Sequence, residues 1–135
     1  MRPISRITLF GIRLSIFALL LYWVLIFTGT HVPVVPHAVP RINDKLVHFT
    51  AFFGLATLLC YVTNSDRLLF RFGLIAAGCA IYAALDELSQ KLVAGRVADP
   101  WDFVADLSGA VSAILLYAIA RRVITWRPYS TCEAS

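Results

Sequence analysis

The sequence predicts an all-α, polytopic membrane protein: one domain over residues 1–135, folded as a bundle of four transmembrane helices with both termini in the cytoplasm. Of its 135 residues, 59% are hydrophobic and 15% are charged, whereas a soluble domain has roughly 45 to 50% apolar and about 25% charged residues. The chain also contains four nearly uncharged stretches close to spanning length, and its positive charges gather on one side of them. These observations exclude an ordinary soluble domain and a disordered chain.

The first helix is expected over residues 12–30, because no charged residue occurs from Leu14 to Thr30. Spanning the hydrocarbon core of a bilayer takes about 20 mostly apolar residues. Three arginines precede this stretch, as in a signal peptide, but no A-x-A cleavage pattern follows it. We therefore expect an uncleaved membrane anchor.

Three further helices are expected over residues 46–63, 70–89 and 102–120. The third has the shortest apolar run, which is bounded by Arg71 and Asp86. It reaches spanning length if the Arg71 side chain snorkels to one interface while the acids at its other end face that interface or the bundle interior.

Charge sorting predicts the orientation of the bundle. The N-terminus, the turn after the second helix and the C-terminal tail carry eight of the twelve cations, and the other two loops with their adjoining helix ends carry six of the eight acids. By the positive-inside rule the basic side is cytoplasmic. This rule and attraction to anionic lipids account for the basic face, so we expect no nucleic-acid partner.

Small residues at spacings of four predict close helix packing, since they let helix backbones approach each other in lipid. They form one stripe or more on each of the last three helices: Thr50 and Gly54; Gly73 and Ala77; Ala76, Ala80 and Ala84; Ala105, Gly109 and Ala113.

Polar residues open the second helix. Asp44 and His48 lie four residues apart and therefore on one face, with Lys45 beside them. One interpretation is local: Asp44 complements the helix N-terminus, Lys45 marks the interface and His48 satisfies a nearby carbonyl. The other is that they belong to a functional site.

The end of the third helix carries a second polar group. Glu87 shares a face with Gln90 and Lys91, and Asp86 also reaches Gln90 at a spacing of four. A solvated Glu87–Lys91 pair would be worth only a few tenths of a kcal/mol. The acids directly adjoin an apolar run that is too short to spare a turn, which favours an inward-facing role.

The fourth helix supplies the third group. Asp99 before Pro100 is typical of a helix N-cap followed by proline at the first helical position. Asp102 is favoured by the helix dipole and is open to either reading. Asp106 lies within an apolar stretch, where an unpartnered carboxylate would cost about 2.5 to 3.5 kcal/mol on insertion scales.

His48, Glu87 and Asp106 thus lie at one depth on three helices, and we expect them to converge. With Lys45 and Arg96 as the available cations, such a cluster suits either an anionic headgroup or a divalent ion. We favour the headgroup and predict no metal and no cofactor. A divalent ion remains open because acids and a histidine are present, but their spacing is not selective for any metal.

Together these residues carry a resemblance to a known family. Over residues 42–117 the chain is similar to the VanZ-like family of small bacterial integral membrane proteins. The matching motifs are Asp44-Lys45-x-x-His48-Phe49, Glu87-x-x-Gln90, Arg96, Asp102 and Asp106 before Gly109-Ala110. The resemblance implies a multi-pass protein of the bacterial cytoplasmic (inner) membrane that acts in the cell envelope. The founding member of the family is associated with low-level resistance to the glycopeptide antibiotic teicoplanin.

The first functional hypothesis is a membrane protein whose outward-facing cluster binds or processes an anionic lipid or a lipid-linked cell-wall precursor. The alternative is a non-enzymatic accessory protein whose cluster is an internal ion-pair network. Whether the protein is an enzyme and whether it forms homo-oligomers stay open, and four helices without an inverted repeat argue against a transporter. The expected catalytic residues are His48, Glu87 and Asp102, and the expected substrate-binding residues are Asp44, Lys45, Gln90, Arg96 and Asp106.

Overall fold

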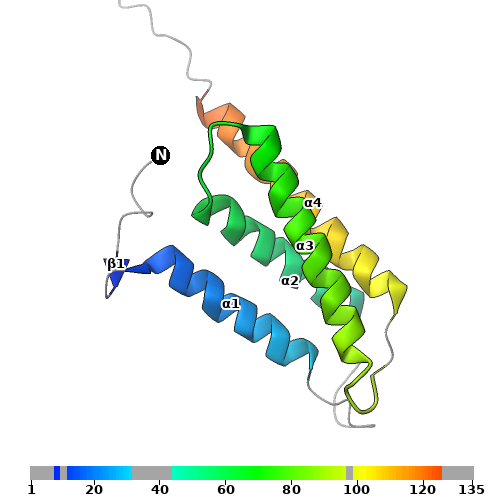
Figure 1. The fold of residues 1–135 in the computed structure, drawn as a ribbon. Helices are drawn as coiled ribbons and strands as arrows, with labels where there is room; N and C mark the ends of the chain where they lie inside the picture. The colour runs from blue at the N-terminus through cyan, green and yellow to red at the C-terminus, as the bar shows by residue number, and fades with distance from the viewer. Residues whose placement is uncertain (1–7, 10–11, 32–43, 97–98, 126–135) are drawn as a thin grey trace, which may run out of the picture.

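The protein is a bundle of four helices, as the sequence predicts (Figure 1). A computed structural model describes residues 8–9, 12–31, 44–96 and 99–125. Two strands of two residues each, β1 (Thr8–Leu9) and β2 (Ile12–Arg13), pair antiparallel ahead of the first helix. The helices are α1 (Leu14–Thr30), α2 (Asp44–Val62), α3 (Leu68–Gln90) and α4 (Pro100–Thr125).

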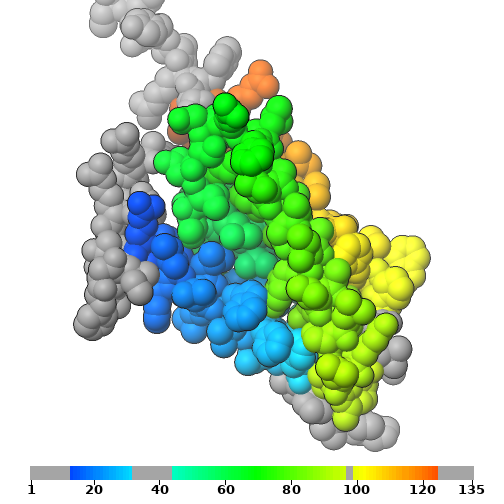
Figure 2. All heavy atoms as spheres, viewed as in Figure 1, coloured from blue at the N-terminus to red at the C-terminus, as the bar shows by residue number. Residues whose placement is uncertain are grey.

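The lengths and composition of these helices fit a multi-pass membrane protein. Helices α2, α3 and α4 are long and apolar enough to cross a membrane, and α1 is a shorter apolar helix of 17 residues. Large apolar side chains lie exposed on every helix, as expected where lipid is the solvent. Figure 2 shows α1 against the flank of the bundle formed by the other helices.

Two glycines account for the closest helix contacts. A Cβ atom at Gly109 of α4 would lie 2.2 Å from the backbone oxygen of Phe49 in α2. A Cβ atom at Gly54 would lie 2.1 Å from the hydroxyl of Tyr22 in α1, which donates a hydrogen bond to the Ala51 carbonyl at 3.1 Å. Both glycine stripes are therefore packing surfaces, as expected. The prediction of a packing stripe at Gly73 is wrong, since no atom of the described residues lies within 4 Å of a Cβ atom there.

Arg71 corrects another expectation, because its side chain is 4% exposed and does not snorkel. It turns toward the C-terminal end of α2, where Nε donates to Thr63 Oγ1 at 3.0 Å and Nη2 donates to the Cys60 carbonyl. Its guanidinium also lies 5.4 Å from the ring centroid of Tyr117. A cation that satisfies the last carbonyls of a helix is favoured there by the helix dipole.

Helices α2 and α4 begin, and α1 and α3 end, at the same end of the bundle (Figure 1). The acidic helix ends thereby come together at one end, while Arg71 and the last residues of α4 lie at the other.

Candidate functional site

A polar cluster fills the end of the bundle where α2 and α4 begin. We define it as four buried side chains, with exposed fractions of 8% or less, and three residues on its rim. The buried four are His48 of α2, Glu87 of α3, and Asp102 and Asp106 of α4. The rim consists of Asp44, Lys45 and Asp99.

The centre of the cluster is a hydrogen bond between His48 and Asp106. His48 Nδ1 lies 3.0 Å from Asp106 Oδ1, and both side chains are almost fully buried. The bond is possible because Gly109, one turn further along α4, lets α4 touch the backbone of α2 beside His48. An ionised carboxylate can only accept, so Nδ1 is the donor, and in the neutral ring Nε2 then carries the lone pair.

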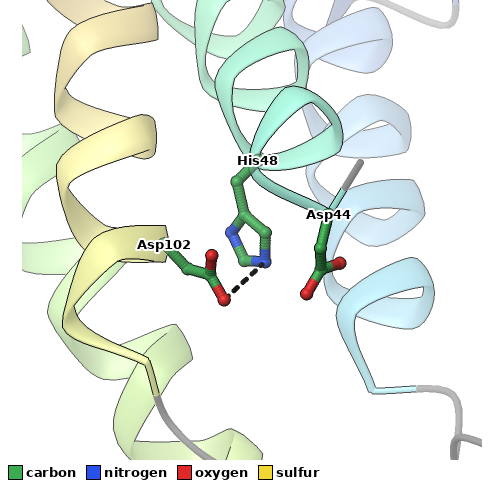
Figure 3. Close-up of side chains that lie close together, drawn as sticks. All are labelled: Asp44, His48 and Asp102. Atoms are coloured by element: carbon green, nitrogen blue, oxygen red, sulfur yellow. Dashed lines mark ion pairs between the residues drawn. The ribbon is translucent and has the colours of Figure 1, made fainter. Parts of the chain in front are cut away.

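The other edge of the His48 ring faces two more carboxylates. Figure 3 shows the ring between Asp102 and Asp44, with Nε2 at 4.0 Å from Asp102 Oδ2. One ligand atom from each of the three residues lies within 4.8 Å of the others. Asp44 is exposed while the other two are buried, so this side of His48 opens toward the end of the bundle.

Lys45 joins the start of α2 to the start of α4. Its Nζ lies 2.6 Å from Asp99 Oδ2 and 2.9 Å from Asp102 Oδ1. Asp99 also caps α4, since its Oδ1 accepts from the backbone N–H of Trp101 at 3.0 Å, as the Asp99-Pro100 pattern predicts. Hydrogen bonding to Lys45, and then to Trp101, lowers the pKa of the Asp99 carboxyl. Lys45 is therefore occupied by two carboxylates and is not a bare cation awaiting an anion.

Glu87 brings α3 into the cluster. Its Oε2 accepts a hydrogen bond from the Asp99 backbone N–H at 3.1 Å. One ligand atom of Glu87 lies within 4.8 Å of one from His48 and one from Asp106. Within the described part of the chain, Glu87 Oε1 and Asp106 Oδ2 are buried without a hydrogen-bond partner. The three helices thus converge at one depth, and they leave two carboxylate oxygens unsatisfied.

Gln90, an expected substrate-binding residue, contacts Asp86 and not Glu87 of the polar cluster. Its Nε2 donates to Asp86 Oδ2 at 2.8 Å, and not to Glu87. Of the two pairings that the helix spacing allowed, Asp86 with Gln90 is the one that forms.

Arg96 is found beside the end of α1. Its Nη2 approaches the Gly29 carbonyl at 3.5 Å. Arg96, which was expected to contact phosphate, thus lies at the same end of the bundle as the cluster.

A second polar network, around Asp86, was missed as a functional feature. Asp86 is 2% exposed, and its Oδ1 accepts from Thr30 Oγ1 of α1 at 3.0 Å. His31 lies 3.9 Å from the same oxygen and hydrogen-bonds Ser89 Oγ at 2.9 Å. The available signal was Asp86 itself, an acid directly adjoining an apolar run. Nothing in the sequence indicated that its partners would come from the end of α1.

The arrangement combines two chemical capabilities. A buried histidine held by a carboxylate, with its second nitrogen available, can accept a proton or bind a metal ion. A buried carboxylate with one oxygen left without a donor is stabilised by a nearby cation or by taking up a proton. The site is acidic overall, with five carboxylates (Asp44, Glu87, Asp99, Asp102 and Asp106) around His48 and Lys45.

Comparisons with known proteins find a matching family and a relative. The profile of the family described as VanZ/LLP1 matches residues 12–121. A protein of the yeast Schizosaccharomyces pombe, described as uncharacterized, is 31% identical over 108 residues, which cover 79% of this chain and 65% of that protein. The chain therefore spans slightly less than two thirds of the length of that relative. No solved structure matches.

Proposed function

The chain belongs to the VanZ/LLP1 family, and from this premise we propose that its polar cluster binds, and processes, the phosphate-bearing headgroup of an anionic membrane lipid or lipid-linked cell-wall precursor. The observation that carries the proposal is the His48–Asp106 pair. It is buried one to two turns inside the end of a membrane bundle, and the free edge of the imidazole faces the opening. That is the depth at which lipid headgroups meet the hydrocarbon core.

Two features support a headgroup over a water-soluble ligand. Trp101 at the start of α4 is 66% exposed beside the cluster, and such aromatic side chains are typical of the membrane interface. Arg96 lies at the same end of the bundle, and arginine is suited to contact phosphate. His48 and Glu87 are the groups placed to transfer a proton.

The yeast relative favours the broader of the two substrate classes. A phosphate-bearing membrane lipid is common to bacteria and yeasts, whereas a bacterial cell-wall precursor is not. For this chain we propose a place in the bacterial cytoplasmic membrane, with the cluster on the outer side and both termini in the cytoplasm. The basic residues at the opposite end of the bundle support this orientation. Any contribution to glycopeptide resistance would follow from envelope lipids.

Binding to vesicles tests the proposal. The full chain, purified in detergent, is reconstituted with phosphatidylcholine alone or with phosphatidylglycerol, and retained lipid is measured by mass spectrometry after delipidation and exchange. We expect preferential retention of phosphatidylglycerol and its loss by at least about tenfold in His48→Ala or Arg96→Ala, which corresponds to about 1.4 kcal/mol. Asp66→Asn, in the exposed turn at the other end of the bundle, is the control. Equal retention by wild type and the cluster variants would rule out headgroup binding here.

A structural role is the competing function, and Lys45 favours it because it ties α2 to α4 through two carboxylates. The double variant Lys45→Met with Asp102→Asn removes one pair without leaving a lone buried charge. If it keeps lipid retention and stability while each single change only destabilises, the cluster is a packing network. If the double variant folds but retains no lipid, the cluster is a binding site.

A further inference from the structure

The open edge of His48 faces two carboxylates, and we propose that Asp44, His48 and Asp102 bind a divalent transition-metal ion. One ligand atom from each of the three lies within 4.8 Å of the others. Mixed imidazole and carboxylate donors are those that Zn²⁺ and Mn²⁺ accept in proteins. No feature of the linear sequence selects this set, because Asp102 joins it only through the packing of α4 on α2.

The protonation of His48 assigns the ligand atom. Nδ1 lies 3.0 Å from Asp106 Oδ1, so in the neutral ring that donates there, Nε2 carries the lone pair and faces Asp102. A histidine that donates one nitrogen to a carboxylate and gives the other to the ion is the usual arrangement of metal sites, because the carboxylate fixes the tautomer and raises the basicity of the ring. Asp106 is thus a positioning residue for the ion.

The two carboxylate oxygens of Asp102 face different partners, which leaves one of them for the ion. Its Oδ1 is paired with Lys45 Nζ at 2.9 Å, while its Oδ2 turns toward His48 Nε2 at 4.0 Å (Figure 3). Asp44 lies one helical turn before His48 and is exposed, so an ion can enter from the headgroup side. Bonds of about 2.1 Å at tetrahedral angles place ligand atoms about 3.4 Å apart, so atoms that now lie within 4.8 Å of one another need to close by up to about 1.4 Å.

The unsatisfied oxygens of two acids next to His48 are a second observation that favours a cation in the cluster. Glu87 Oε1 and Asp106 Oδ2 are buried and have no hydrogen-bond partner among the described residues, and both side chains are more than nine-tenths buried. Buried negative charge is stable only beside a compensating positive charge. His48, Glu87 and Asp106 also form a close trio. Because Asp106 occupies Nδ1, we assign the ion to Nε2, which faces Asp102.

A bound ion would also give an acid-rich cluster the positive charge that a phosphate group requires. The ion site nevertheless goes beyond the proposed lipid function and stands on its own ligand set, because it can be measured with no lipid added. A wild-type chain that binds metal but shows no preference for the anionic lipid would reject the lipid function alone. A wild-type chain that retains the anionic lipid but binds no metal would reject the ion site alone.

Metal titration of the purified protein tests the ion site. The full chain, prepared in detergent with an affinity tag free of histidine, is stripped with chelator and titrated with Zn²⁺ or Mn²⁺ by calorimetry, and bound metal is counted by elemental analysis. We expect one ion per chain. Affinity should fall by more than about 100-fold in His48→Ala and Asp102→Asn, and by about 10- to 100-fold in Asp106→Asn, which removes only the positioning carboxylate.

Matched controls separate this site from others. His31→Ala removes the histidine of the Asp86 network, and Asp66→Asn removes an exposed acid at the other end of the bundle; both should bind as wild type does. Asp44→Asn changes an exposed residue, so it reports on the ligand without threatening the fold, which is checked by thermal melting. The proposal is overturned by the absence of saturable binding, by unchanged affinity in folded Asp44→Asn, or by a Glu87→Gln loss as large as that of Asp44→Asn.

Discussion

Gly109→Ala is the sharpest test of how packing builds the polar cluster. The added Cβ atom would lie 2.2 Å from the Phe49 carbonyl oxygen and 3.1 Å from the Phe53 nitrogen, both backbone atoms that cannot rotate away. Ordinary contact begins at 3.4 Å, so α4 must move away from α2 by about 1 Å. The same movement stretches the 3.0 Å bond between His48 and Asp106 to about 4 Å, beyond hydrogen-bonding distance.

Two free-energy contributions set the magnitude. Overpacking of this kind costs about 1 to 3 kcal/mol, and loss of an interhelical hydrogen bond in a membrane protein costs about 0.6 to 1.7 kcal/mol. The free energy of unfolding should therefore fall by about 2 to 4 kcal/mol. Alanine is otherwise a better helix former than glycine by roughly 0.5 to 1 kcal/mol. The predicted loss of stability is therefore opposite to the gain that helix preference alone would give.

The assay is unfolding in mixed micelles by titration with dodecyl sulfate, followed by circular dichroism. Gly78→Ala is the matched control, because nothing lies within 4 Å of a Cβ atom at that position. We expect Gly78→Ala to be neutral or stabilising and Gly109→Ala to be clearly destabilising. A Gly109→Ala variant as stable as Gly78→Ala would refute the close approach of α2 and α4.

Two further predictions concern the rim and the second network. In Lys45→Met the pKa of Asp99 should rise toward its ordinary value of 3.8, because Lys45 is the main cause of its depression. In the wild type, the stability contributed by this pair is fully present above about pH 4 and is lost as pH falls through the lowered pKa. A carboxyl NMR titration that shows no shift would contradict the pairing. Thr30→Val removes the 3.0 Å hydrogen bond to Asp86 and should cost about 0.6 to 1.7 kcal/mol in the same unfolding assay. Thr28→Val, whose hydroxyl bonds only carbonyls of its own helix among the contacts described, should cost less, and equal losses would reject the link between α1 and α3.

Much of the fold could be predicted because membrane helices follow simple rules. Spanning length and charge located the four helices, and the cost of a carboxylate in lipid predicted that Asp106 would have a partner. The convergence of His48, Glu87 and Asp106 followed from their common depth. These inferences rest on distance along a helix axis, which a sequence specifies directly.

Inferences that failed depend on the rotation of helices about their axes, which a sequence specifies poorly. Arg71 turned inward to the end of α2 instead of snorkelling, and the stripe at Gly73 faces away from any neighbour. Asp86 pairs with Gln90 of its own helix as the spacing predicts, but its second partner is Thr30 at the end of α1, which the sequence did not indicate. Spacing tells which residues share a face, but only packing decides what that face meets.

The most direct test of the central claim, that the polar cluster is a headgroup site in the membrane, is an experimental structure of the protein in nanodiscs containing phosphatidylglycerol. We expect phosphate density at the edge of the cluster formed by His48 and Asp44, at the end of the bundle where Arg96 also lies. Lipid density confined to the outer flanks of the helices, with Lys45 paired as before and the cluster closed, would contradict it.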